Sequence, residues 1–383
     1  LPMEPYPSYL IFDREGVLKD DIHNGARADE PIDDEPYTFD LVNREFQYAN
    51  YMNEYCYKVF GNCTYESRDY SMDKRTEQLQ AATKGNGINI VLLGDVFTDV
   101  DIATGFYRDA MEFAMESFFS VEPTKTYREY FNVYMVYAVS KKRQIGKMYV
   151  TDSALWTYYD TSVSIFTDIV GTPHKVDEYV AAVQNTSIKI PCAIINNDMR
   201  GKFTLFTSSS KTYAYAGLYS RTYLRRMIHH EFIGHGFGLL GDEYGHPLNW
   251  EIPESQKSRI RSFQQDGSYL NISLTKDPTA VPWAHMIGHP RYPEVGVAGS
   301  GATYMTGVWH STPDGLMGSK VSTFNPVCRE LIVRRILTLA GEEYTFEKFL
   351  EKDVASTPTM IDTRLLLISP EYRHCPPIYI GEK

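Results

Sequence analysis

Hydrophobic runs and helix-spaced apolar residues alternate along the first half of the chain. The runs are short and rich in Val, Ile, Leu and aromatic residues, which is typical of strands buried on both faces. The segments between them repeat apolar residues at helical spacing. We therefore expect strands at 88–95, 130–139 and 188–195, and helices at 102–119 and 176–183. This alternation predicts an α/β fold with a mainly parallel, twisted sheet.

A stretch of small and β-prone residues at 204–217 precedes a histidine-rich segment. We expect this stretch to form an edge strand, whose free N–H and C=O groups can pair with an extended peptide. The sheet and the histidine-rich helix would then occupy residues 88–244 of a main domain at 86–383. Residues 1–85 are acidic and are expected to form an N-terminal extension or a small subdomain.

The C-terminal subdomain, residues 245–383, begins differently. Residues 245–322 hold many of the Gly, Pro and His residues and predict a long irregular region, which at this length is usually functional. Two helices, at 326–340 and 345–352, are expected to follow it. On the first of these helices the predicted outward face carries Arg329, Arg334 and Arg335.

Composition adds limits on location and partners. The net charge of −11 argues against a nucleic-acid partner. No apolar run is long enough to predict a transmembrane helix, and no signal peptide is visible. The five cysteines include no Cys-x-x-Cys pair, which argues against a structural zinc ribbon. Cys56 and Cys63 are compatible with a short disulfide loop or with two buried thiols.

The candidate chemistry is concentrated in residues 226–244. His230, Glu231 and His235 lie in an apolar helical segment that ends in glycines, and Asp242 and Glu243 follow. A catalytic zinc site needs two or three imidazole or carboxylate ligands, an open position for water, and a carboxylate beside that water. This pattern predicts a zinc site with Glu231 as its general base.

The spacing of the two histidines departs from the usual four residues. On an α-helix, residues five apart point about 140° away from each other. His230 and His235 can therefore share a metal only if the helix contains a π-bulge, a distortion that is frequent at functional sites. Gly234 lowers the cost of this distortion. His229 fits the site less well and is expected to support or pack against it.

The third metal ligand is expected from the Asp242-Glu243 pair, with Asp242 slightly preferred. Gly236, Gly238 and Gly241 should end the helix soon after His235 and turn the chain back towards the metal. The acid that does not bind the metal would support a ligand histidine.

These residues resemble a known family. Residues 230–244 are similar to the site of the bacterial IgA-specific metallo-endopeptidases, metzincin-like zinc proteases with a His-Glu-x-Gly-His core and a later Asp-Glu-Tyr. Further similar stretches are 90–98, 131–134, 195–198, 316–317 and 325–330, so that the resemblance spans about 88–340. Two features differ from the family pattern: the extra residue before His235, and Gly318 after Met317.

The resemblance implies a metzincin-like fold, with a backing helix, an active-site helix, and Met317 in a methionine turn beneath the metal. It also implies a protein or peptide substrate and a secreted, periplasmic or cell-surface location. Tyr244 is a supporting candidate, and Tyr304 and His310 are candidate donors to the oxyanion of the reaction. Three stretches match the glycosylation pattern: 62–64, 185–187 and 271–273.

The sequence thus predicts a zinc endopeptidase that binds its substrate along the edge strand. Two alternatives remain open. The first is a metal-stabilised module that binds protein or glycan with little turnover. The second is a zinc exopeptidase of the dipeptidyl type, because the dipeptidyl-peptidase III family has a similar His-Glu-x-x-x-His helix. That family takes its third ligand from a Glu on a later helix.

Overall fold

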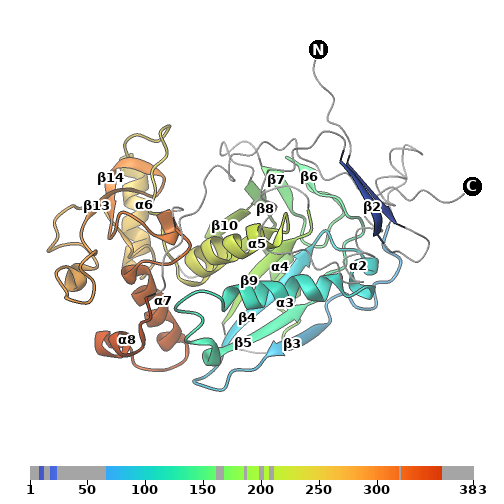
Figure 1. Cartoon of the computed structure of the whole chain (residues 1–383), viewed down its shortest axis with the longest axis horizontal. Coiled ribbons are helices and arrows are strands. Elements are labelled where there is room, and N and C mark those ends of the chain that lie inside the picture. Colours follow the sequence, from blue (N-terminus) through green and yellow to red (C-terminus); the bar gives the residue numbers. More distant parts are fainter. Residues whose placement is uncertain are drawn as a thin grey trace, which may run out of the picture.

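The expected apolar runs form the centre of a nine-stranded sheet in the computed structural model of the chain (Figure 1). The structure describes residues 66–355 except 161–167, 185–187, 198–201, 207–210 and 319–320, together with strands β1 (Ser8–Phe12) and β2 (Leu18–His23). β1 and β2 pair antiparallel with each other. Cys56, Cys63 and the glycosylation patterns at 62–64 and 185–187 lie outside the described residues.

The large sheet has the strand order β3-β5-β4-β9-β11-β10-β8-β7-β6. Its strands are β3 (Thr76–Gln80), β4 (Ile88–Asp95), β5 (Phe131–Val136), β6 (Gly146–Lys147), β7 (Tyr158–Asp160), β8 (Asp168–Val170), β9 (Lys189–Ile195), β10 (Lys202–Phe206) and β11 (Thr212–Gly217). The neighbours β5, β4, β9 and β11 are parallel, whereas β3–β5, β10–β11 and β7–β8 are antiparallel. The predicted α/β class with a largely parallel centre is confirmed, and the sheet includes β3, before residue 86.

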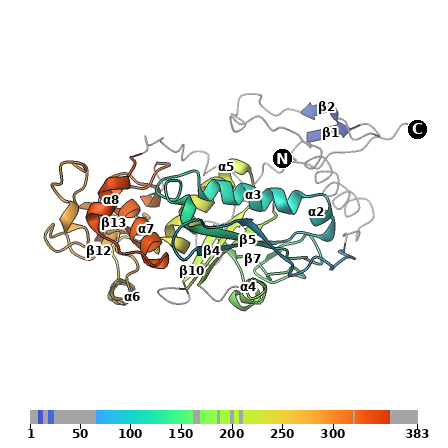
Figure 2. The same ribbon diagram turned by 90° about the horizontal axis from the view of Figure 1, so that it is seen from below.

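Both faces of the sheet are covered, because the alternating side chains of its strands enter two apolar cores. Ile90 and Leu92 of β4 point into the larger core, and Val91 and Leu93 point into the smaller one. Helix α3 (Phe106–Phe118) packs on the first face together with α5 (Arg221–Met227), and α4 (Pro173–Val180) packs on the second, as Figure 2 shows.

The single helix expected at 102–119 is divided. A short helix, α2 (Asp99–Ala103), precedes α3, and the helical conformation is interrupted at Gly105, whose φ is +86°. A 3₁₀ turn, η1 (Arg128–Tyr130), leads into β5. Thr98 is the N-cap of α2, and its backbone and hydroxyl both donate to the carboxylate of Asp101.

The strand before the histidine-rich helix is not at the edge of the sheet. β10 pairs with β11 along its whole length, and β8 pairs with β10 on the other side. That second pairing is limited to Lys202 and Asp168 in the described part of the chain. The predicted edge strand is therefore wrong for the sheet as a whole, although residues 203–206 carry no described pairing with β8.

The C-terminal part contains more regular structure than expected. Its elements are α6 (Glu254–Gln265), β12 (Ile272–Ser273), η3 (Ala284–Met286), β13 (Ala298–Gly301), β14 (Tyr304–His310), η4 (Leu316–Gly318), α7 (Pro326–Leu339) and α8 (Phe346–Lys352). β12, β14 and β13 form an antiparallel sheet. The prediction of an irregular region at 245–322 is wrong. Helix α6 is so polar that only Ile260 is buried in it, and its sequence therefore shows little apolar periodicity.

No helix among the described residues is long and apolar enough to span a membrane.

The predicted helices α7 and α8 are confirmed, but one arginine of α7 faces inward. Arg329 is buried and forms a two-pronged ion pair with Asp353, at 2.7 Å from Nε to Oδ1 and 2.8 Å from Nη2 to Oδ2. Arg329 also donates to the carbonyl of Phe324, and the hydroxyl of Tyr292 donates to Asp353. The expectation that Arg329 faces solvent is wrong, because α7 packs against the segment that carries Asp353.

Replacing Arg329 with Met should destabilise the protein by about 3–5 kcal/mol, because Asp353 would remain buried without its partner. Urea unfolding measures this change. The control is Arg261→Met, which breaks the exposed pair with Glu254 and should cost only about 0–1 kcal/mol. Equal effects of the two substitutions would contradict the assignment of Arg329 and Asp353 as a structural pair.

Candidate metal centre

The histidine-rich segment forms a π-helix, η2 (Ile228–Phe237), which continues directly from α5. Hydrogen bonds from residue i to i+5 widen each turn, so that residues five apart lie on nearly the same face. The rings of His230 and His235 consequently stand 4.9 Å apart, centroid to centroid. The predicted distortion of the helix is confirmed, and it extends over ten residues.

The helix ends differently from the expectation. Gly236 lies inside η2 and Gly238 has an ordinary right-handed conformation. The reversal occurs at Leu239, whose φ is +55°, and the N–H of Leu240 closes the turn by bonding the carbonyl of Gly234 at 3.0 Å. The turn returns the chain towards the two histidines, as the glycines had suggested.

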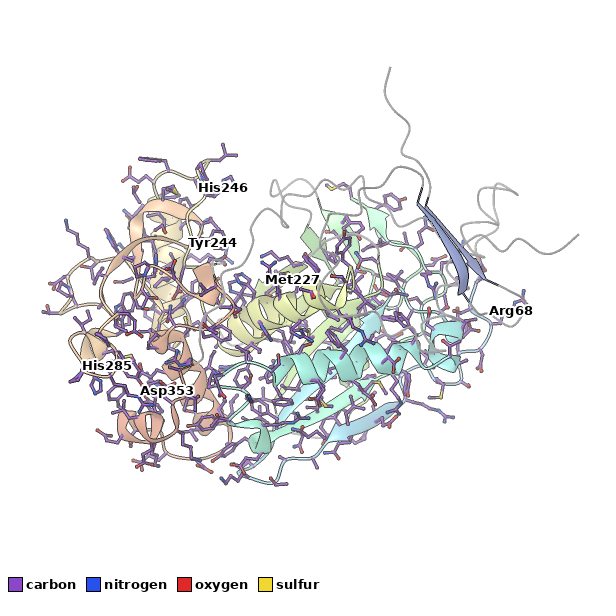
Figure 3. All side chains as sticks on the ribbon, in the orientation of Figure 1. Arg68, Met227, Tyr244, His246, His285 and Asp353 are labelled. Atoms are coloured by element: carbon purple, nitrogen blue, oxygen red, sulfur yellow. The ribbon has the colours of Figure 1, made fainter. Side chains whose placement is uncertain are left out.

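Asp242 is the acid that this turn brings to the histidines. Its Oδ1 lies 3.2 Å from Nε2 of His230 and 3.3 Å from Nε2 of His235. The three ligand atoms lie within 4.8 Å of one another, close enough to hold one metal ion. The site lies where η2 meets the segment that leads to Tyr244. Figure 3 labels Met227, the last residue of α5 before η2, and Tyr244.

Backbone carbonyls orient both imidazole rings. Nδ1 of His235 lies 2.7 Å from the carbonyl oxygen of Leu240, and Nδ1 of His230 lies 3.4 Å from that of Leu316. A carbonyl oxygen can only accept, so Nδ1 of each ring carries a proton, and Nε2 is the ring nitrogen that lies beside Asp242. Acceptors that bind one ring nitrogen in this way orient a histidine so that its other nitrogen can bind a metal.

Two buried atoms of this group have no hydrogen-bond partner: Nε2 of His230 and Oδ1 of Asp242. They lie 3.2 Å apart without forming a hydrogen bond. Buried polar atoms without a partner are rare and costly, and a bound ion is one established reason for them. Two imidazole nitrogens and one carboxylate oxygen are also a donor set that suits zinc.

Glu243 points away from this group. Its carboxylate accepts hydrogen bonds from Asn325 at 2.8 Å, Asn271 at 3.1 Å and the thiol of Cys328 at 3.2 Å. Burial raises the pKa of Glu243. Asn271 is itself fully buried, so the glycosylation pattern at 271–273 does not offer an exposed acceptor in the folded protein.

Glu231 is held by β10. Its Oε1 lies 2.9 Å from Nζ of Lys202, and its Oε2 accepts a hydrogen bond of 2.8 Å from the hydroxyl of Thr204. Oε1 also lies 4.0 Å from Nε2 of His230, so the carboxylate borders the candidate metal position. Lys202 and Thr204 were not predicted, because a lysine and a threonine in a short strand form no recognisable motif.

The local charges favour a cation between these groups. Burial works against ionisation of Glu231, but Lys202 and the two histidines outweigh it and lower the pKa of Glu231 to about 2. Burial likewise works against a charged His235, but Asp242 outweighs it and raises the pKa of His235 to about 9. Burial also works against ionisation of Asp242, but the two histidines outweigh it and lower the pKa of Asp242. Both carboxylates are therefore ionised at neutral pH.

Comparison with known proteins agrees with this site. The model of the IgA Peptidase M64 family matches residues 77–293, which include β3, the sheet, η2 and Asp242. The chain belongs to the IgA Peptidase M64 family. It is therefore a peptidase, a hydrolase that acts on peptide bonds of a protein substrate. The search of curated proteins found no match.

In this M64 peptidase, Met317 lies against the π-helix. It sits in the 3₁₀ turn η4, which lies beyond the residues that the family model matches. A Cβ added to Gly234 would lie 2.3 Å from the sulfur of Met317. The carbonyl of Met317 accepts the N–H of Glu243, and that of the preceding Leu316 faces His230. The turn thus contacts both the helix and the segment after it.

His229 faces α3 instead of the candidate metal position. Its Nε2 lies 2.9 Å from the carbonyl oxygen of Ser117 and 3.0 Å from the hydroxyl of Ser120. Burial lowers the pKa of His229 to about 4, so the ring is neutral at physiological pH. This contact fixes the rotation of η2 about its axis, in line with the packing role expected for His229.

The three remaining candidates lie on the C-terminal side of the site. The carbonyl of Tyr244 accepts the N–H of Thr303 at 3.0 Å, which ties the segment after Asp242 to the turn before β14. Tyr304 packs on the small apolar core around Ile252 and Val308. His310 is buried, and its Nδ1 lies 2.8 Å from the carbonyl of Ser300. Their part in catalysis remains a prediction.

Replacing Gly234 with Ala should destabilise the peptidase, because the new methyl group would overlap the sulfur of Met317. We expect a loss of about 1–3 kcal/mol in the free energy of unfolding. The double variant with Met317→Ala is the control, since it removes the clashing atom. Gly234→Ala should cost clearly less in that background, and equal costs in both backgrounds would contradict the contact.

Proposed function

We propose that this peptidase is a zinc-dependent endopeptidase with a metzincin-like site. The observation that carries the proposal is the convergence of Nε2 of His230, Nε2 of His235 and Oδ1 of Asp242. Two of these atoms are buried without a hydrogen-bond partner. His230, His235 and Asp242 would hold the metal, and Glu243 would stabilise the segment that presents Asp242.

Zinc bound at this position would supply Lewis-acid chemistry, lowering the pKa of water to about 7 and polarising the substrate carbonyl. Glu231 is placed to act as the general base. It would take a proton from the attacking water and deliver it to the amine nitrogen of the breaking peptide bond. Lys202 and Thr204 hold one carboxylate oxygen each, which keeps Glu231 oriented while the proton moves.

The substrate is proposed to lie extended beside β10. This strand contacts Glu231 through Lys202 and Thr204, and Phe206 lies edge-on to His235 with ring centroids 6.2 Å apart. Residues 203–206 carry no described pairing with β8, so their backbone suits pairing with a peptide. The segment from Tyr244 to β14 would form the opposite wall. A secreted, periplasmic or cell-surface location is proposed on the family resemblance alone.

The position of Asp242 favours an endopeptidase over a dipeptidyl-type exopeptidase. Asp242 lies in the turn directly after η2 and not on a later helix. The donor set of two histidines and one carboxylate also occurs in iron oxygenases. Membership of a peptidase family and the adjacent Glu231 favour zinc and hydrolysis.

Replacing Glu231 with Gln should leave the zinc content unchanged and lower kcat by about 10²–10⁴-fold, because glutamine cannot take up the water proton. Zinc is quantified by mass spectrometry, and cleavage is followed on a library of internally quenched peptides with and without a chelator. Glu254→Gln, on exposed α6, is the control. Wild-type turnover by Glu231→Gln would contradict the mechanism. A zinc-loaded wild type without chelator-sensitive cleavage would favour the binding module.

Replacing Asp242 with Asn should lower zinc affinity by about tenfold or more, because a neutral amide is a much weaker ligand than a carboxylate. Glu243→Gln should keep zinc and instead lower the free energy of unfolding by about 1–3 kcal/mol, because it disturbs a buried hydrogen-bond network. Competitive zinc titration and urea unfolding measure the two effects. Zinc loss by Glu243→Gln with zinc retained by Asp242→Asn would reverse the assignment.

A further inference from the structure

A second pocket, distinct from the candidate metal centre, lies between the end of η2 and helix α7. Its volume is about 170 Å³. The turn Gly238–Leu240 forms one wall, and Leu331, Arg335 and Thr338 of α7 form another. The remaining lining residues are Gly267, Leu270, Arg334 and Leu339. The pocket has room for several water molecules or a small organic molecule, but not for a folded partner.

Arg335 distinguishes this pocket from an ordinary apolar gap. Its Nε is buried without a hydrogen-bond partner, and no described acid lies within ion-pair distance of its guanidinium. Its described contact is with the ring of Phe237 in η2, at 5.8 Å. Burial lowers the pKa of Arg335 to about 10, with no described carboxylate to offset this effect, so it remains charged at neutral pH. We expected Arg335 on the solvent-exposed face of α7, and this expectation is wrong.

The other two arginines of α7 are either paired with an acid or exposed to solvent, unlike Arg335. Arg329 is buried and donates two hydrogen bonds to the carboxylate of Asp353. Arg334 also lines the pocket, but it is exposed and lies over the ring of Tyr344 at 5.9 Å. A partly buried guanidinium without a counter-charge is unfavourable, because desolvation is not repaid by an ion pair. An anion in the pocket would remove this imbalance.

We propose that this pocket binds a small carboxylate with a short apolar chain. The carboxylate would pair with the fork of Arg335, since guanidinium and carboxylate match in geometry. The apolar chain would lie against the leucines. Chloride, sulfate or phosphate could satisfy the charge, but they would leave the apolar walls without a partner. The ligand could be a free acid or the C-terminal residue of a peptide, which share this chemistry.

Binding here would also support the neighbouring metal centre. The wall Gly238–Leu240 is the turn that connects His235 to Asp242, and the carbonyl of Leu240 faces Nδ1 of His235. A ligand that binds the folded chain at this turn stabilises the folded state by an amount that grows with the ligand concentration relative to its Kd. The inference does not depend on the proposed function, because the pocket uses none of the three candidate metal ligands.

Thermal unfolding of the full, metal-free chain tests the proposal. Sodium isovalerate should raise the melting temperature saturably, above sodium chloride at equal ionic strength, and isovaleramide, its uncharged analogue, should not. N-acetylleucine represents a peptide C-terminus. Whichever of isovalerate and N-acetylleucine raises the melting temperature more shows whether the ligand is a free acid or a peptide C-terminus. If sodium sulfate raised the melting temperature as much as sodium isovalerate does, the role of the apolar walls would be overturned. The absence of any carboxylate effect in wild type would overturn the proposal.

Variants assign the effect to Arg335. Arg335→Met keeps the apolar stem of the side chain and should fold at least as stably as wild type, because it removes an unpaired charge. It should lower the affinity for isovalerate by about tenfold or more. Arg335→Lys should retain part of the effect, and provides the test if Arg335→Met does not fold. Arg261→Met is the control and should respond as wild type does. An unchanged response in Arg335→Met or Arg335→Lys relative to Arg261→Met would overturn the assignment.

Discussion

The i→i+5 hydrogen bonding of η2 is the constraint on which the candidate site depends. Histidines five residues apart diverge on an α-helix and converge on a π-helix. The result is a ring separation of 4.9 Å between His230 and His235. A π-helix is intrinsically less favourable than an α-helix, so it persists only where the surrounding structure holds it. In this peptidase the surroundings supply that support on three sides.

The first support is the C-terminal end of α3 and the turn after it, which contact His229 through Ser117 and Ser120. The second is the turn at Met317, which requires Gly234 and presents a carbonyl to His230. The third is β10, whose Lys202 and Thr204 hold Glu231. These contacts come from segments far apart in the sequence, and together they define how η2 is rotated and where Glu231 and the two rings point.

Charge compensation divides the buried ionic groups into two kinds. Glu231 with Lys202, and Arg329 with Asp353, are paired within the chain, and each pair joins two segments of the fold. Asp242 and Arg335 are different. Asp242 faces two imidazoles with one carboxylate oxygen left without a hydrogen bond, and Arg335 faces leucines. We propose that ligands complete these two groups, a cation at Asp242 and a carboxylate at Arg335.

The sequence by itself determined the α/β class, the central strands, helices α7 and α8, and the need for a π-distortion at His235. These features follow from local periodicity and spacing, which act over a few residues. Only the tertiary structure decided that Asp242 and not Glu243 lies beside the histidines, since the two are neighbours with the same chemistry. Likewise, Lys202, the inward Arg329 and the unpaired Arg335 depend on which distant segment packs against each. A polar helix such as α6 gives almost no apolar periodicity, and its place against the small C-terminal core is a matter of tertiary packing.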